Sequence, residues 1–155
     1  MTASKQPAPG TKRPIDMRYL ESTVGYSIRR AQMAVFQHIY ESFDDKALTL
    51  VQFSVMAVAA DNPGVTQSEL AQVLAVERPR IVPILNRLEE LGFAKRVVSE
   101  DDKRNRQIVL TASGAARLRE LKRRFAAHER KLDELLDKRK AGLLDALHRL
   151  SGIGE

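Results

Sequence analysis

The sequence has 155 residues, which fits one domain with a moderate core. It carries 26 Lys and Arg against 20 Asp and Glu, and this net charge of +6 suits a polyanionic partner. The absence of cysteine excludes disulfides, thiolate zinc sites and cysteine redox sensing. There is neither an apolar run near the ~18 residues of a membrane span nor the hydrophobic core of a signal peptide. We therefore expect a soluble cytoplasmic protein without a membrane partner.

The N-terminal third combines a basic tail with a long helical pattern. Residues 1–15 are rich in Pro, Lys and Arg, which predicts a flexible basic arm. From Asp16, a reasonable N-cap, apolar residues recur at steps of three and four and predict one amphipathic helix of about 25 residues. The recurring residues are Leu20, Val24, Ile28, Ala31, Val35, Ile39 and Phe43. We assign residues 16–48 to an N-terminal dimerisation helix.

The central part of the chain predicts three further helices. Thr49 can cap a nearly all-apolar helix, LVQFSVMAVAA, which the breakers in DNPG end. Thr66 and Glu69 form a capping box at the start of the next helix. The fourth helix spans Arg78–Leu91, and Gly92 provides its C-terminal stop.

Two strand-like runs, Phe93–Val98 and Gln107–Leu110, then bracket a charged loop. The order helix, turn, helix and basic β-hairpin is typical of a winged helix-turn-helix. The sequence thus predicts a mainly α fold with a small β-hairpin wing, and residues 49–111 form its DNA-binding lobe.

The C-terminal residues 112–155 predict two more helices. Thr111 can cap the first, whose apolar residues follow a heptad pattern. That seam consists of Leu118, Leu121, Phe125, His128, Leu132 and Leu135. Asp137 can cap a final leucine-rich helix. We interpret these helices as a homodimer interface, and the alternative is a helix packed into the core of its own chain.

The fourth helix carries the candidate base-reading residues opposite its apolar face: Arg78, Arg80, Asn86 and Arg87. Arginine can pair with guanine and asparagine with adenine in the major groove of double-stranded DNA. Residues near the helix N-terminus reach base edges most easily, which favours Arg78 and Arg80. The alternative is a solvated charged face.

Further candidate DNA contacts lie in the wing and at the start of the third helix. They are Lys103, Arg104, Arg106, Gln67 and Ser68. A basic hairpin tip can enter a minor groove or bind phosphates, and a helix N-terminus can hold a phosphate. We expect Asp102 to orient Arg104 through a bidentate hydrogen bond.

The stretch PGVTQSELAQVLAVERPRIVPILNRLEELG, then Asp102-Lys103-Arg104, NRQIV, Leu110-Thr111 and Gly114, resembles the MarR family of bacterial regulators. The resemblance implies an obligate homodimer with interlocked terminal helices. It also implies a repressor that leaves a pseudopalindromic operator when a small molecule binds, with Arg104 as the wing arginine. Pro83 departs from the family, because that position often carries a groove-facing polar residue. A proline there requires either a late helix start or a bend.

The N-terminal helix also supplies candidate ligand contacts, because the family binds effectors between its dimer helices and its DNA-binding lobe. The candidates on that helix are Tyr26, Arg29, Arg30, Met33, Phe36, Gln37 and Tyr40, and Phe53 from the next helix is a further candidate. Apolar walls with few polar groups suit an aromatic acid, and paired arginines suit phosphates. The RRAQ-x-AVF stretch is similar to regulators that answer to hydroxycinnamoyl-CoA thioesters, which indicates control of aromatic-compound catabolism. The alternative is that these are dimer-packing and surface residues.

No cofactor is expected, since His38, His128 and His148 lack helical metal-ligand spacing. An enzyme is disfavoured, because the sequence has no nucleophile elbow, P-loop or dinucleotide fingerprint. Two alternatives remain, a nonspecific architectural DNA-binding protein and an interaction module that has lost DNA binding. The favoured hypothesis is a regulator whose two recognition helices lie ~34 Å apart in successive major grooves.

Overall fold

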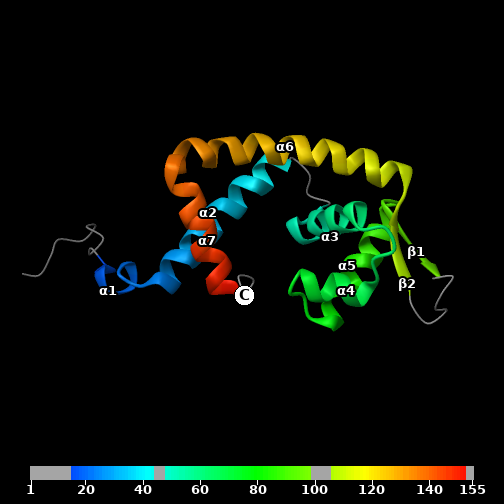
Figure 1. Ribbon diagram of the computed structural model, residues 1–155, viewed down its shortest axis with the longest axis horizontal. Helices are drawn as coiled ribbons and strands as arrows, with labels where there is room; N and C mark the ends of the chain where they lie inside the picture. Colours follow the sequence, from blue (N-terminus) through cyan, green and yellow to red (C-terminus); the bar gives the residue numbers. More distant parts are fainter. Residues whose placement is uncertain (1–14, 44–47, 99–105, 153–155) are drawn as a thin grey trace, which may run out of the picture. The chain divides into compact units, whose positions relative to one another are not determined.

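The computed structural model describes residues 15–43, 48–98 and 106–152. Its elements are α1 (Arg18–Glu21), α2 (Val24–Phe43), α3 (Leu50–Asp61), α4 (Gln67–Val73), α5 (Arg78–Glu90), β1 (Ala94–Val98), β2 (Arg106–Leu110), α6 (Ala112–Leu136), a 3-10 turn (Asp137–Arg139) and α7 (Lys140–Ser151) (Figure 1). The chain divides into two compact units, Met1–Val35 and Phe36–Glu155, with the boundary inside α2. Among the described residues, no helix has the length and apolarity to cross a bilayer.

The second unit contains the helix-turn-helix, formed by α3, α4 and α5 beside the first part of α6 (Figure 1). The sequence predicted the capping box that starts α4 at Thr66 and a cap at Thr49, where the structure shows a second capping box at the start of α3. In the α4 box, Glu69 accepts a hydrogen bond from the Thr66 amide at 2.8 Å. These local bonds satisfy amides that would otherwise lack a partner at the helix start. Residues only three positions apart in the sequence therefore determine where each of these two helices begins.

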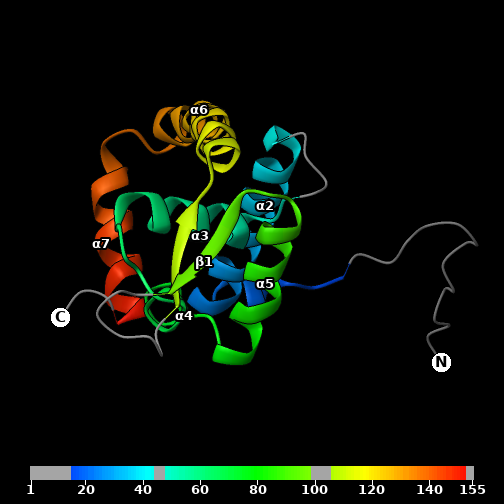
Figure 2. The same ribbon diagram turned by 90° about the vertical axis from the view of Figure 1, so that its right-hand side faces the viewer.

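The predicted wing is an antiparallel hairpin in which Ala94 of β1 pairs with Leu110 of β2 (Figure 2). The amide of Ile108 also donates to the carbonyl of Val65 at 2.9 Å, so β2 is bonded on both sides. Ile108 is buried, and β1 packs beside α5. The hairpin is thereby attached to the lobe at its base. Its tip, which carries Asp102, Lys103 and Arg104, lies outside the described residues.

A close backbone contact joins the wing to α6. The Thr111 hydroxyl donates to the Gly92 carbonyl at 2.6 Å and accepts from the Gly114 amide at 3.0 Å. A Cβ on Gly114 would lie 1.9 Å from the carbonyl oxygen of Phe93, which is far inside van der Waals contact. Only glycine fits that position. Thr111 therefore caps the helix, and Gly114, three residues later, allows the close approach of two backbone segments.

The single N-terminal helix predicted from Asp16 is wrong, because the chain turns between α1 and α2. At that turn the hydroxyls of Ser22 and Thr23 donate to the carbonyls of Tyr19 and Leu20 at 2.7 and 2.8 Å. Such side-chain bonds compete with the helical bonds of the backbone. Asp16 accepts a hydrogen bond from the Arg18 amide at 3.0 Å, although Met17 is the N-cap.

The heptad prediction in α6 also needs correction. Leu118, Leu121 and His128 are buried within one chain, which leaves them little surface for a partner. Phe125 packs against Phe53, with ring centroids 5.3 Å apart. By contrast, Leu135 is 71% exposed. The first part of the seam is therefore core, as the alternative interpretation held, and its apolar surface is free only toward the C-terminal end.

The final helix starts later than predicted. Asp137 has φ +47°, a left-handed conformation, and begins the 3-10 turn. Arg139 is the N-cap of α7, and it makes no side-chain cap bond. The helix has no buried residue, and four of its leucines are exposed within one chain: Leu143, Leu144, Leu147 and Leu150. This apolar face is available to a partner.

Candidate nucleic-acid interface

The first turn of α5 carries exposed positive charge. Its apolar face buries Ile81, Leu85 and Leu88 in the lobe, while Arg78 and Arg80 are exposed. That turn contains no acidic residue. Cations at a helix N-terminus oppose the helix dipole, so the two arginines do not stabilise α5 locally. Both side chains are positioned to bind an external anion.

Pro83 lies inside α5, five residues after its first residue, so the late start considered for this helix is wrong. A proline has no amide hydrogen, and the Pro79 carbonyl therefore lacks its usual donor at Pro83. Both prolines are exposed. With helical steps of three and four, Pro83 shares the outward face with Arg80 and Arg87. The centre of that face is therefore occupied by the ring of Pro83, which cannot form a hydrogen bond.

Asn86 and Arg87, at the other end of α5, already have partners in the chain. The Asn86 Oδ1 accepts from Nη2 of Arg96 in β1 at 2.9 Å. Arg87 pairs with Glu90 at 3.2 Å on the exposed surface. Both side chains remain exposed. The structure thus distinguishes these two candidates from Arg78 and Arg80, for which it shows no ion pair with a described residue.

The start of α4 is a less favourable place for a phosphate than its sequence suggested. Ser68 is exposed and Gln67 is half-buried. Hydrogen bonds from the Thr66 amide and hydroxyl hold the pKa of Glu69 below its usual range, so its carboxylate is charged at neutral pH. A phosphate bound by Gln67 and Ser68 would meet this charge. These two residues are therefore weaker candidates than the arginines of α5.

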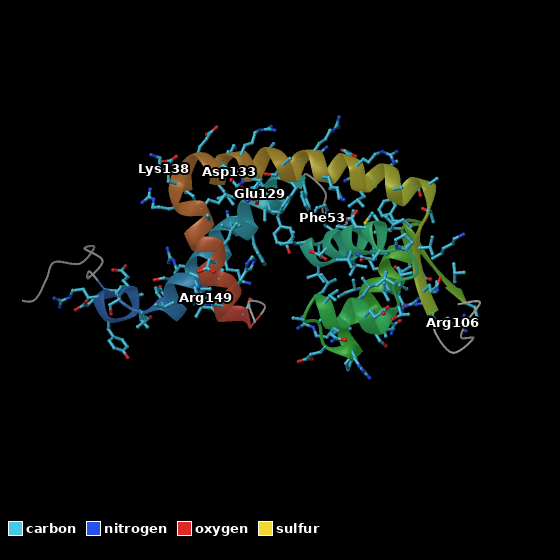
Figure 3. The ribbon with its side chains drawn as sticks, viewed as in Figure 1. Phe53, Arg106, Glu129, Asp133, Lys138 and Arg149 are labelled. Atoms are coloured by element: carbon cyan, nitrogen blue, oxygen red, sulfur yellow. The ribbon has the colours of Figure 1, made fainter. Side chains whose placement is uncertain are left out.

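Arg106 is the one predicted wing residue among those that the structure describes. It is exposed at the start of β2, opposite Val98, at the end of the hairpin away from α6 (Figure 3). Asp102, Lys103 and Arg104 lie outside the described residues. The structure therefore shows where the charged loop leaves the lobe.

The predicted ligand contacts fall in both units. In the first unit, Tyr26 and Arg30 line a surface hollow of about 370 Å³ together with Met17, Glu21 and Ser27. Arg29 and Met33 are exposed on the same helix. Hydroxyl, carboxylate and guanidinium groups thus surround a space large enough for part of a ligand.

In the second unit, Tyr40 is exposed, Phe36 is half-buried and Gln37 donates to Glu41 at 3.1 Å. Phe53, labelled in Figure 3, requires correction, because it is only 8% exposed. Its ring packs between those of Phe43 and Phe125. Its ring is part of the hydrophobic core instead of the wall of an open cleft.

Sequence reasoning missed one pair of titratable residues. The Nδ1 atoms of His38 in α2 and His128 in α6 lie 2.7 Å apart. His128 is 3% exposed, and burial lowers its pKa. Ninety residues separate the two histidines, so no local pattern signals the contact. Within the described parts of the chain, no cluster of three or more His, Asp or Glu could hold a metal ion.

Comparison with known proteins identifies the family. A putative transcriptional regulatory protein for the hcr operon of Thauera aromatica is 30% identical over 129 residues, which cover 82% of this chain and 78% of that protein. The sequence profile of the MarR family matches residues 48–105. The chain belongs to the MarR family.

Solved MarR-family structures resemble this chain along most of its length. The transcriptional repressor CouR bound to a 23-mer DNA duplex has a TM-score of 0.81 and 35% identity, covering 92% of this chain and all of CouR. CouR bound to p-coumaroyl-CoA has the same TM-score and 34% identity, covering 89% and 98% of the two chains. The prediction of a MarR-type winged helix-turn-helix is confirmed.

Proposed function

We propose that this protein is a sequence-specific transcriptional repressor that an aromatic acyl-CoA, or the corresponding aromatic acid, releases from its operator. The observation that carries the proposal is the exposed positive first turn of α5, which has no ion pair with a described residue, in a lobe whose fold matches CouR on DNA. In this proposal Arg78 and Arg80, exposed in the first turn of α5, contact base edges in a major groove. A regulator of this kind acts in the bacterial cytoplasm and needs no catalytic group.

Other contacts position the lobe on the DNA backbone. In this proposal Lys103, Arg104 and Arg106 of the wing bind phosphates or the minor groove, with Asp102 orienting Arg104. Gln67 and Ser68 bind one phosphate at the start of α4. Because many contacts are to phosphates, affinity should fall steeply as salt rises.

The active form is a homodimer in this proposal. Val24 and Ile28 on α2 are exposed within one chain, as are Leu135 and the four leucines of α7. Large apolar residues that one chain leaves exposed along helices favour a second copy as their partner. Residues 16–48 and 112–155 would thus supply the dimer interface, while residues 49–111 bind one operator half-site.

The effector is an aromatic acid or its CoA thioester. Tyr26 and Arg30 share one hollow, and Arg29 is a second exposed cation on the same helix. An aromatic side chain next to guanidinium groups suits a ligand that combines a ring with phosphates. CouR, which is similar along most of the chain, has been solved with p-coumaroyl-CoA.

Fluorescence anisotropy with the full chain tests the proposal. The labelled duplex comes from upstream of the protein's own gene, random DNA of equal length is the competitor, and p-coumaroyl-CoA, p-coumarate and free CoA are then titrated separately. Specific binding that p-coumaroyl-CoA or p-coumarate reverses, and that free CoA leaves intact, is the expected result. Equal, salt-sensitive binding to both DNAs would instead support an architectural protein.

The Arg29→Ala variant is the matched test of the effector contacts. It should bind the operator like the parent but need more p-coumaroyl-CoA for release. If p-coumaroyl-CoA releases parent and variant at the same concentration, Arg29 has no role in binding it.

A further inference from the structure

Arg96 in the middle of β1 fixes the orientation of Asn86 on the recognition helix α5. Its Nη2 donates to Oδ1 of Asn86 at 2.9 Å, and its backbone amide donates to Oε1 of Glu89 at 2.9 Å. Its Nη1 forms an ion pair with Oε2 of Glu89. The side chain of Arg96 is only 21% exposed. Glu89 therefore holds Arg96 through its backbone amide and its guanidinium, and the guanidinium holds Asn86 in turn.

The chemistry of the pair decides which end of the Asn86 carboxamide faces Arg96. A guanidinium only donates hydrogen bonds, so its partner on Asn86 is the carbonyl oxygen and not the amide nitrogen. A charge-assisted bond to Oδ1 draws electron density from the carboxamide, which weakens the oxygen as a second acceptor and strengthens Nδ2 as a donor. The exposed Asn86 thus offers hydrogen bonds and accepts them poorly.

A free asparagine reads adenine because it uses both ends of its carboxamide, donating to N7 and accepting from N6. Guanine instead presents two acceptors, N7 and O6, in the major groove. We propose that Arg96 converts Asn86 into a donor-only reader that selects guanine over adenine at one position of each half-site. The inference rests on the proposed DNA-binding function and replaces the adenine preference expected from the residue type alone.

Selection from a random duplex library with the full-length protein tests the inference. The parent is compared with Asn86→Ala, with Arg96→Met, which keeps an unbranched apolar stem and loses the donors, and with Gln72→Ala as a control at an exposed position of α4. In the parent, one position per half-site should prefer guanine over adenine by roughly tenfold. Asn86→Ala should abolish that preference, whereas Gln72→Ala should keep it.

Arg96→Met should move the same position toward adenine, because the freed Oδ1 can again accept from N6. Asn86→Lys provides a test that does not depend on the wing, since lysine is a donor-only side chain and should retain guanine. An Asn86-dependent position that prefers adenine in the parent would overturn the inference. An unchanged profile in Asn86→Ala, or a loss of the guanine preference in Asn86→Lys, would also overturn it.

These outcomes separate the inference from the function on which it rests. If the parent enriches no sequence, the proposed sequence-specific function fails and the inference fails with it. If the parent enriches an operator that does not depend on Asn86, only the inference fails.

Discussion

The Nδ1 atoms of His38 and His128 lie 2.7 Å apart, a distance at which one of them donates a hydrogen bond to the other. Lys131 Nζ, which only donates, lies 3.4 Å from Nε2 of His38, so this nitrogen is the acceptor. His38 then carries its hydrogen on Nδ1 and donates it to Nδ1 of His128. The hydrogen of His128 is consequently on Nε2, which is buried and has no hydrogen-bond partner among the described residues. The contact therefore requires that Nδ1 of His128 carries no hydrogen.

Acid should therefore destabilise the fold through His128. Burial is the largest cause of its lowered pKa, the charge of His38 and that of Lys131 lower it further, and Glu129 acts in the opposite direction. A histidine with a pKa lower in the folded than in the unfolded state contributes stability above pH ~6.5, and this stability is lost as pH falls below that value.

His128→Leu should reduce that loss. Urea unfolding at pH 7.5 and 5.5 would give the free energy of unfolding for the parent, for His128→Leu and for His148→Gln, a control at an exposed position of α7. His148→Gln should lose as much stability as the parent between the two pH values, and His128→Leu should lose less. Equal losses in all three would contradict the assignment.

Gly114→Ala should destabilise the protein by at least ~2 kcal/mol, a magnitude typical of forced overpacking. The new Cβ would meet the Phe93 carbonyl at 1.9 Å, so the wing or α6 must move. Helix propensity alone predicts the opposite effect, an increase of about 1 kcal/mol in the free energy of unfolding. Ala116→Gly at an exposed position of α6 measures that propensity effect and should cost about 1 kcal/mol. Thermal unfolding that shows Gly114→Ala to be neutral or stabilising would exclude the steric explanation.

Pro83→Ala should stabilise the protein by roughly 1–2 kcal/mol. Alanine restores the amide that can donate to the Pro79 carbonyl, against a smaller loss from a more flexible unfolded chain. Pro79→Ala is the matched control, because Pro79 is in the first turn, where amides have no helical acceptor. It should be neutral or slightly destabilising in urea unfolding. Similar effects of the two changes would mean that the interior position of Pro83 does not matter.

Arg80→Ala should weaken operator binding by about 1–3 kcal/mol, because this side chain is in the first turn of α5 and is exposed. Arg87→Ala should have a smaller effect, since Arg87 is paired with Glu90. Anisotropy titrations at one fixed salt concentration would measure both affinities. A larger loss in Arg87→Ala would indicate that the C-terminal part of α5 makes the main base contacts.

Local chemistry explains which features the sequence predicted. Thr49, Thr66 and Thr111 each cap a helix through an amide three residues away, so neighbouring residues determine these helix starts. The heptad pattern of α6 was ambiguous for a physical reason. A helix packed on its own core and a helix packed on a partner bury the same periodic positions, and only tertiary structure separates Leu121 from Leu135. The contact between His38 and His128 had no sequence signal, because it depends on how α2 meets α6.

The leucines of α7 have a consequence for how the protein responds to its own abundance. In the proposed homodimer, association covers side chains such as Leu144 and Leu147, which one chain alone leaves in water. Mass action then links folding to association, so the melting temperature should rise with protein concentration. Dilution would shift the population toward protomers with one half-site lobe each. Operator occupancy would consequently follow the concentration of the chain more steeply than linearly at low abundance.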